Sequence, residues 1–167
     1  MMRMFKIVTQ LMAALMVLMV SAANASEEKT MAQDFTLKSL SGENLRLQEM
    51  RGDVILVNFW ATWCGPCRKE MPYLDELHQE FADLGFSVLG VNVEQDSNLA
   101  TDFINELEVS FPVLFDNKQQ VSELYKVDAM PMTVMIDRNG YQRVLHRGYV
   151  DGDEEIYRKI IKELIRE

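Results

Sequence analysis

The 167-residue sequence contains little cysteine and histidine, and this scarcity excludes several kinds of protein. Its two cysteines, Cys64 and Cys67, close too small a loop to serve as the disulfide framework of a small scaffold. Its two histidines, His78 and His146, lie far apart in the chain, so spacing gives no support to a Cys–His zinc site. The eight glycines form no nucleotide-binding loop. Chemistry is the better use for the cysteine pair.

The sequence also contains few positively charged residues and few long apolar runs. The chain has 17 Lys and Arg against 26 Asp and Glu, for a formal net charge of −9. An acidic protein is a poor candidate for binding nucleic acid or anionic membrane surfaces. The apolar run Leu11–Val20 is shorter than the ~20 residues that span a bilayer. We therefore predict no nucleic-acid partner, and no stable membrane insertion if the N-terminal segment that holds this run is cleaved.

The first 25 residues have the layout of a secretory signal peptide. Arg3 and Lys6 form a basic start, Leu11–Val20 is the apolar centre, and Ala23-Asn24-Ala25 is an Ala-x-Ala cleavage pattern. We predict cleavage after residue 25 and a mature protein that is periplasmic or otherwise exported. Loss of the two basic residues takes the formal net charge from −9 to −11. An uncleaved anchor helix is the alternative.

The rest of the chain reads as one α/β domain. Residues 26–33 have no hydrophobic period and are expected to form a flexible lead-in, followed by a domain over residues 34–167. Strand patterns alternate with helical ones and end in a hairpin and a helix, which indicates a central mixed β-sheet flanked by helices. Strands are expected over 35–37, 45–47, 54–59, 87–93, 111–115, 133–136 and 141–146, the first two as an N-terminal hairpin, and helices near Cys67, Ser97, Asp116 and Asp153.

The cysteine pair lies where the strand pattern of residues 54–59 meets a helical pattern. Two thiols separated by two residues at such a junction form a thioredoxin-like redox motif. The helix N-terminus favours an anion, which lowers the pKa of the Cys64 thiol and makes it more nucleophilic. Cys67 falls on the apolar stripe of the helix, so it should face the interior, whereas Cys64 should be exposed. The stripe continues through Met71, Leu74, Leu77 and Phe81.

The segment Asn58-Phe59-Trp60-Ala61-Thr62-Trp63-Cys64-Gly65-Pro66-Cys67 resembles the active-site segment of thioredoxin-fold proteins. Met130-Pro131-Met132-Thr133-Val134 resembles the loop, with a cis proline, that these proteins place opposite the thiols. Thioredoxin has a buried acid at the position of Asn58. An asparagine at this position resembles the exported TlpA/ResA-like branch of the redoxin type. The long spacing from Cys67 to Pro131 points to the same branch, with a helix–strand insertion over about Asp96–Asn117.

This resemblance implies a thiol–disulfide oxidoreductase that works without a cofactor. Cys64 would be the nucleophile and Cys67 the resolving thiol of a redox disulfide. Trp63, Met130 and Pro131 would bind substrate. Disulfide-containing client proteins, such as apocytochrome c, metallochaperones or oxidase assembly factors, are the implied substrates. A membrane thiol reductase of the DsbD/CcdA kind is the implied electron donor.

The acid–base partner of the thiols is harder to assign from the sequence. A carboxylate that takes the proton of Cys67 would help resolution, and the amide of Asn58 cannot titrate. The resemblance implies a functional glutamate after the strand Val91-Asn92-Val93, where Glu94 is the nearest acid. Glu94 is therefore the candidate, and a solvated loop carboxylate, with Gln95 in the family position, is the alternative.

Two other functions stay open. Cys64, Cys67 and the thioether of Met130 could form a soft Cu(I) site, although methionines that alternate along a strand usually pack the core. The protein could also be a disulfide-forming oxidant. The pair Gly65-Pro66 between the cysteines is that of thioredoxin, which is strongly reducing. We therefore predict a protein-disulfide reductase. Trp60 is predicted to pack in the core.

Overall fold

The computed structural model describes residues 30–167. The predicted signal peptide and the first residues of the predicted lead-in lie outside the described residues, so both stay predictions. Within residues 30–167, the longest and most apolar helices still fall short of what a membrane span requires.

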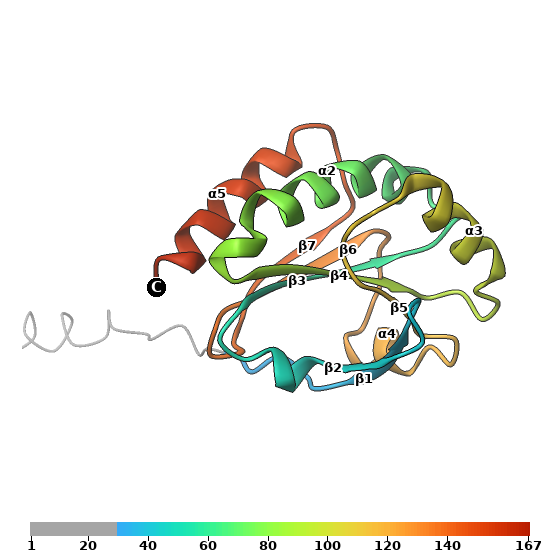
Figure 1. Ribbon diagram of the computed structural model, residues 1–167, viewed down its shortest axis with the longest axis horizontal. Helices are drawn as coiled ribbons and strands as arrows, with labels where there is room; N and C mark the ends of the chain where they lie inside the picture. The colour runs from blue at the N-terminus through green and yellow to red at the C-terminus, as the bar shows by residue number, and fades with distance from the viewer. Residues whose placement is uncertain (1–29) are drawn as a thin grey trace, which may run out of the picture.

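A seven-stranded mixed β-sheet forms the centre of the domain, in the order β2-β1-β5-β4-β3-β6-β7 (Figure 1). Strands β3, β4 and β5 are parallel, and the remaining neighbours pair antiparallel. The strands are β1 (Thr36–Ser39), β2 (Asn44–Arg46), β3 (Val54–Trp60), β4 (Phe86–Asn92), β5 (Val113–Phe115), β6 (Met132–Ile136) and β7 (Gln142–Arg147). The predicted mixed sheet and N-terminal hairpin are confirmed.

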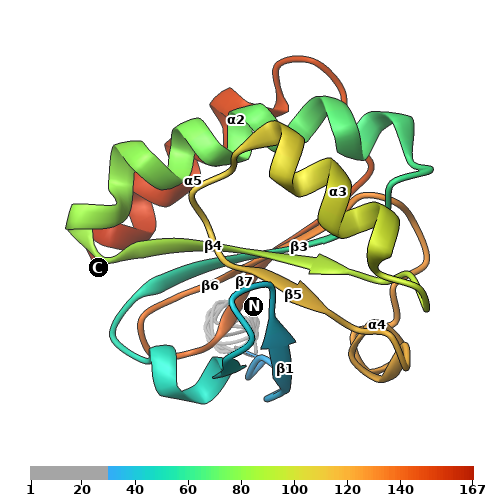
Figure 2. The same cartoon turned by 45° about the vertical axis from the view of Figure 1, so that its right-hand side comes forward.

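Helices cover both faces of this sheet (Figures 1 and 2). Helices α2 (Gly65–Phe81), α3 (Asn98–Leu107) and α5 (Asp153–Ile165) lie on one face. The short α4 (Gln120–Leu124) lies on the other face, and the β1–β2 hairpin curls toward this same side of the sheet. Two short 3-10 helices, η1 (Leu47–Met50) and η2 (Ala82–Leu84), complete the chain. The predicted insertion consists of α3 and β5, and it extends the sheet beyond β4.

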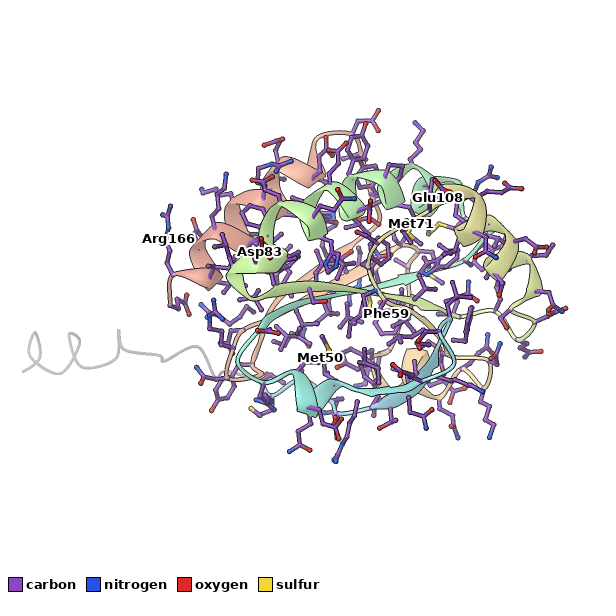
Figure 3. The ribbon with its side chains drawn as sticks, in the orientation of Figure 1. Met50, Phe59, Met71, Asp83, Glu108 and Arg166 are labelled. Atoms are coloured by element: carbon purple, nitrogen blue, oxygen red, sulfur yellow. A yellow bond between two sulfur atoms is a disulfide. The ribbon has the colours of Figure 1, made fainter. Side chains whose placement is uncertain are left out.

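Strand β3 is central because both of its faces are apolar. All seven of its residues are buried, as expected for a strand covered on both sides. Met71 of α2 fills the layer between helices and sheet, whereas Phe59 of β3 points into the opposite layer (Figure 3). There Phe59 packs on Tyr125, with ring centroids 5.4 Å apart. The end of β3 that leads into the cysteine motif is thus held from both faces.

The lead-in predicted to be flexible over residues 26–33 needs a correction. The Gln142 N–H donates to the Thr30 carbonyl at 2.8 Å, and the Ala32 N–H donates to the Gly140 carbonyl at 3.0 Å. These bonds attach the segment to the turn between β6 and β7. Residues 30–33 are held because an edge of the sheet offers them backbone partners, which hydrophobic periodicity does not reveal.

The helix starts also differ in detail from the predictions. Helix α2 begins at Gly65, two residues before the predicted start at Cys67. Ser97 is the N-cap residue of α3, but its side chain makes no cap hydrogen bond. Instead the Asp96 carboxylate accepts from the Asn98 N–H at 3.0 Å. The neighbouring carboxylate is the stronger acceptor and caps this helix start in place of the serine hydroxyl.

Candidate active site

The cysteine pair is positioned by the turn from β3 into α2. Cys64 is the N-cap residue of α2, and its Sγ accepts a hydrogen bond from the Cys67 N–H at 3.2 Å. The two sulfurs form a disulfide, with Cα atoms 5.3 Å apart. Pro66 lies in the first helical turn, where its missing N–H has no helical partner to lose. The Cys67 N–H thus points at the Cys64 sulfur and can stabilise its thiolate.

The burial of the two sulfurs corrects one prediction. Cys67 is 1% exposed, as its place on the helical stripe predicted, but Cys64 is only 5% exposed. The prediction that Cys64 is exposed is therefore wrong for the disulfide form. The bond to Cys67 and the cap hydrogen bond draw the sulfur of Cys64 against the helix. Cys64 is still the more accessible of the two.

Two of the three residues predicted to bind substrate, Trp63 and Met130, line one surface hollow. Trp63 is 69% exposed and lines a surface hollow together with Met130, whereas Trp60 is fully buried in the core, as predicted. The peptide bond between Met130 and Pro131 is cis, and the Pro131 carbonyl accepts from the Gly148 N–H at 2.8 Å. The exposed indole and the thioether therefore flank one surface beside the cysteines.

Glu94 lies in the loop after β4 and is bound to the segment that precedes Cys64. Its carboxylate accepts from the Thr62 N–H at 2.9 Å, from the Thr62 hydroxyl at 2.7 Å and from the Asn92 amide at 2.8 Å. Two of these hydrogen bonds tie the half-buried carboxylate to the segment that precedes Cys64, and the third ties it to Asn92 at the end of β4. Glu94 thus helps to hold Thr62 in place, and its acid–base role stays a prediction.

A second carboxyl, Glu70, was missed by the sequence analysis. Glu70 follows Cys67 by one helical turn on the buried side of α2 and is 1% exposed. The Asn58 amide donates to Glu70 Oε2 at 2.8 Å and to the Thr133 hydroxyl at 3.0 Å. Burial raises the pKa of Glu70 to about 7, and the hydrogen bond from Asn58 opposes this effect. Its three-residue spacing from Cys67 was the available signal, since it puts both residues on one helix face.

This arrangement pairs a thiol with a proton acceptor matched to neutral pH. A carboxyl with a pKa of about 7 exchanges protons readily near neutrality. Cys67 and Glu70 share one buried helix face, so Glu70 is a second candidate for the acid–base partner of the Cys67 thiol. A buried carboxyl of α2 is thus hydrogen-bonded to the buried amide of Asn58 on β3.

The fold, with the cysteine pair at the start of α2, defines a thioredoxin-like protein. A family model described as Redoxin matches residues 26–165, and the chain belongs to that family. The chain is similar to the thiol-disulfide oxidoreductase ResA of Geobacillus kaustophilus, with 39% identity over 109 residues that cover 65% of this chain and 63% of that protein. The chain thus spans less than two thirds of that relative's length.

Two further comparisons agree with this assignment. The thioredoxin-like protein YneN of Bacillus subtilis is 39% identical over 125 residues, which cover 73% of this chain and 72% of that protein. A Chlorobium tepidum structure described as a thiol:disulfide interchange protein DsbE matches with a TM-score of 0.79 and 33% identity. That match covers 83% of this chain and 98% of the other chain. The chain is therefore ResA-like in sequence and DsbE-like in fold.

Proposed function

We propose that the protein is an exported thiol–disulfide oxidoreductase that reduces disulfides in client proteins. The observation that supports this most is the Cys64–Cys67 disulfide at the N-terminus of α2, with the buried Glu70 carboxyl one turn further along. The similarity to proteins named thiol-disulfide oxidoreductase ResA supports the same reaction. The signal-peptide layout of residues 1–25 supports export to the periplasm or its equivalent.

The reaction proceeds by two exchanges that start from the dithiol form. The Cys64 thiolate attacks one sulfur of the client disulfide, which forms a mixed disulfide and releases a client thiolate. Glu70 then accepts the proton of the Cys67 thiol. The Cys67 thiolate attacks the Sγ of Cys64, releases the second client thiolate and forms the Cys64–Cys67 disulfide. The client gains two electrons, and the protein loses two.

Binding and electron supply follow from the surroundings of the site. Trp63, Met130 and Pro131 would contact the client segment that carries the disulfide, since Trp63 directly precedes Cys64 and lines one hollow together with Met130. A protein kept reduced in an oxidising compartment needs electrons from across the membrane. A membrane thiol reductase of the DsbD/CcdA kind is therefore the proposed donor.

Trapping of the mixed disulfide tests this function. In Cys67→Ser, the client should stay attached to Cys64, because the thiol that resolves the intermediate is missing. Non-reducing gel electrophoresis of the exported fraction, followed by mass spectrometry, would detect the adduct and identify the client. The matched control is Cys64→Ser, which lacks the attacking sulfur and should trap much less. Absence of any adduct in Cys67→Ser would contradict the proposal.

Two glutamates compete for the acid–base role, and the pH profile distinguishes them. We expect Glu70→Gln to abolish the inflection near pH 7 in the rate of disulfide reduction, since the pKa of Glu70 is about 7. Glu94→Gln should slow the reaction and leave the inflection in place, because Glu94 holds Thr62. The reverse pattern would assign the proton transfer to Glu94.

Two measurements separate the proposal from its alternatives. A redox potential close to the ~−120 mV of DsbA, far above the ~−270 mV of thioredoxin, would make the protein an oxidant. Stoichiometric Cu(I) binding by the reduced protein, lost in Met130→Ala, would favour copper handling through Cys64, Cys67 and Met130.

A further inference from the structure

The turn between β3 and α2 places both Trp63 and Cys64. The Cys64 N–H donates to the Ala61 carbonyl at 3.2 Å, which closes a turn with Thr62 and Trp63 at its centre. Directly after the turn, the Cys67 N–H donates to the Cys64 sulfur. The position of this sulfur at the start of α2 therefore depends on how the turn is held.

Glu94 holds this turn from the loop that follows β4. Its Oε2 accepts from the Thr62 N–H at 2.9 Å, and its Oε1 accepts from the Thr62 hydroxyl at 2.7 Å. A carboxylate that accepts from two donors of one residue fixes the main chain and the side chain of that residue together. Rotation of Thr62 would break both bonds, and Cys64 lies only two residues further on.

Asn92, the last residue of β4, holds Glu94 in turn. Its side chain is fully buried. The amide nitrogen donates to Glu94 Oε2 at 2.8 Å and to the Trp60 carbonyl at 3.5 Å, and the amide oxygen accepts from the Glu94 N–H at 3.2 Å. Both polar atoms of this amide are therefore used. Asn92 fixes the main chain and the carboxylate of Glu94 relative to the end of β3.

The turn before α4 holds the same loop from a third segment of the chain. The Asn117 amide donates to the carbonyls of Glu94 at 3.0 Å and Gln95 at 3.1 Å. The Gln119 amide donates to the Val93 carbonyl at 3.2 Å. Three consecutive carbonyls of the loop thus accept from side-chain amides, which fixes its path without regular secondary structure. Asn117 is exposed, so it can be replaced without opening the core.

We propose that Asn92 and Asn117 are positioning residues for the attacking thiol. They act through Glu94, which holds Thr62 and thereby keeps Cys64 at the N-terminus of α2. This inference rests on the attacking role proposed for Cys64. While the turn is held, the first N–H groups of α2 stabilise the thiolate. Loss of either amide loosens the turn, so the sulfur is displaced from these donors for part of the time.

The test is the alkylation of Cys64 by iodoacetamide in the reduced full-length chain, which needs a thiolate but no client. Mass spectrometry assigns the modified cysteine, and the rate is measured as a function of pH. In Asn92→Ala the midpoint should move to higher pH by about half a unit, which is about threefold less thiolate below the midpoint. Asn117→Ala should move it in the same direction. Neither change alters the charge of the protein, so the shift reports position.

Thr62 supplies a matched pair of variants. Thr62→Val lacks the hydroxyl that donates to Glu94 and should raise the midpoint as Asn92→Ala does. Thr62→Ser keeps both the hydroxyl and the N–H, so its midpoint should equal that of the wild type. Asn105→Ala, an exposed change on α3, is the control for Asn117→Ala and should leave the midpoint unchanged.

The outcomes separate this inference from the proposed function. A midpoint that stays the same or falls in Asn92→Ala or in Asn117→Ala would overturn the role of that residue. If the buried change at Asn92 prevents folding, the exposed change at Asn117 still decides the inference. Failure of the reduced wild type to reduce 5,5′-dithiobis(2-nitrobenzoate) would instead contradict the oxidoreductase function, whatever the midpoints are.

Discussion

At the scale of single residues, the buried Glu70 carboxyl links pH to the stability of the oxidised protein. Its pKa of about 7 lies above the 4.5 of an ordinary glutamate, because burial disfavours the charged form. A raised pKa means that the folded state binds the proton more tightly than the unfolded state. The stability contributed by the neutral carboxyl is complete below about pH 4.5 and is lost as the pH rises through 7. The loss is about 3 kcal/mol.

We therefore predict that Glu70→Gln stabilises the oxidised protein at pH 8 but not at pH 4. Glutamine mimics the protonated carboxyl and can still accept the hydrogen bond from the Asn58 amide. Urea denaturation at both pH values measures the difference in free energy of unfolding. Glu76→Gln, an exposed change on the same helix, is the control and should show no such pH dependence. An equal effect of Glu70→Gln at pH 4 and pH 8 would refute the assignment.

The residues of the site differ in how readily they can be predicted from the sequence. Cys64 and Cys67 could be found because their spacing and their place at a strand–helix junction are local features. Glu70 could not be found in the same way, since its hydrogen-bonding partner Asn58 lies on another element. That partner in turn contacts Thr133, 75 residues further along the chain. A charged residue within an apolar stripe is ordinarily expected at the surface. Only the packing of α2 on the sheet shows that Glu70 is buried beside Asn58.

At the scale of elements, helix α4 is held by a buried carboxylate that precedes it. Asp116 is 1% exposed, and its carboxylate accepts from the Val121 N–H at 3.2 Å and from the Ser122 N–H at 2.7 Å. Both are first-turn N–H groups with no partner inside the helix. The sequence predicts a helix near Asp116, and in the structure this carboxylate caps α4 from four residues before its first residue.

We predict that Asp116→Ala lowers the free energy of unfolding by about 2 kcal/mol, because it leaves two helix N–H groups without an acceptor. Asp116→Asn retains one side-chain oxygen and should lose less. Chemical denaturation of the oxidised proteins measures both. Asp102→Ala, a change on α3 at a position that is not buried, is the control and should have little effect. Wild-type stability in Asp116→Ala would show that other groups hold α4.

Helix and strand types were easier to predict than their ends. The apolar stripe of α2 gave the helix because Met71, Leu74 and Leu77 repeat on one face, and all three are fully buried. Its start was placed two residues late because Gly65 and Pro66 carry no periodicity. The hydrogen bond of Cys67 to the cap sulfur, which sets the start, depends on the fold of the preceding loop.

At the scale of the whole molecule, the order of strands follows from contacts that the sequence does not display. The N-terminal hairpin was predictable as a local unit, but its place beside β5 was not. Lys38 and Ser39 of β1 pair with Phe115 and Leu114 of β5, more than seventy residues away. Short edge strands can pair with several partners, and only the packing of the complete sheet selects one.

Arg138 joins distant parts of the chain at the end of the sheet opposite the cysteines. Its guanidinium donates to the carbonyls of Gly52, Leu84 and Ile165, which lie before β3, before β4 and at the end of α5. Cys64 and Cys67 follow the other end of β3. The contacts of Arg138 therefore serve the stability of the domain and lie away from the chemistry.

We predict that Arg138→Met lowers the free energy of unfolding by about 2 kcal/mol or more, because three carbonyls lose a charged donor together. Arg138→Lys should recover only part of this loss, since an ammonium cannot reproduce the planar fork of donors. The pH profile of disulfide reduction should stay that of the wild type in both variants. Arg46→Met is the control: its ion pair with Asp34 is exposed and is worth ~1 kcal/mol or less. A shifted pH profile in Arg138→Met would show that this end of the sheet is coupled to Glu70. Equal losses of unfolding free energy in Arg138→Met and Arg46→Met would show that the three carbonyl contacts contribute little.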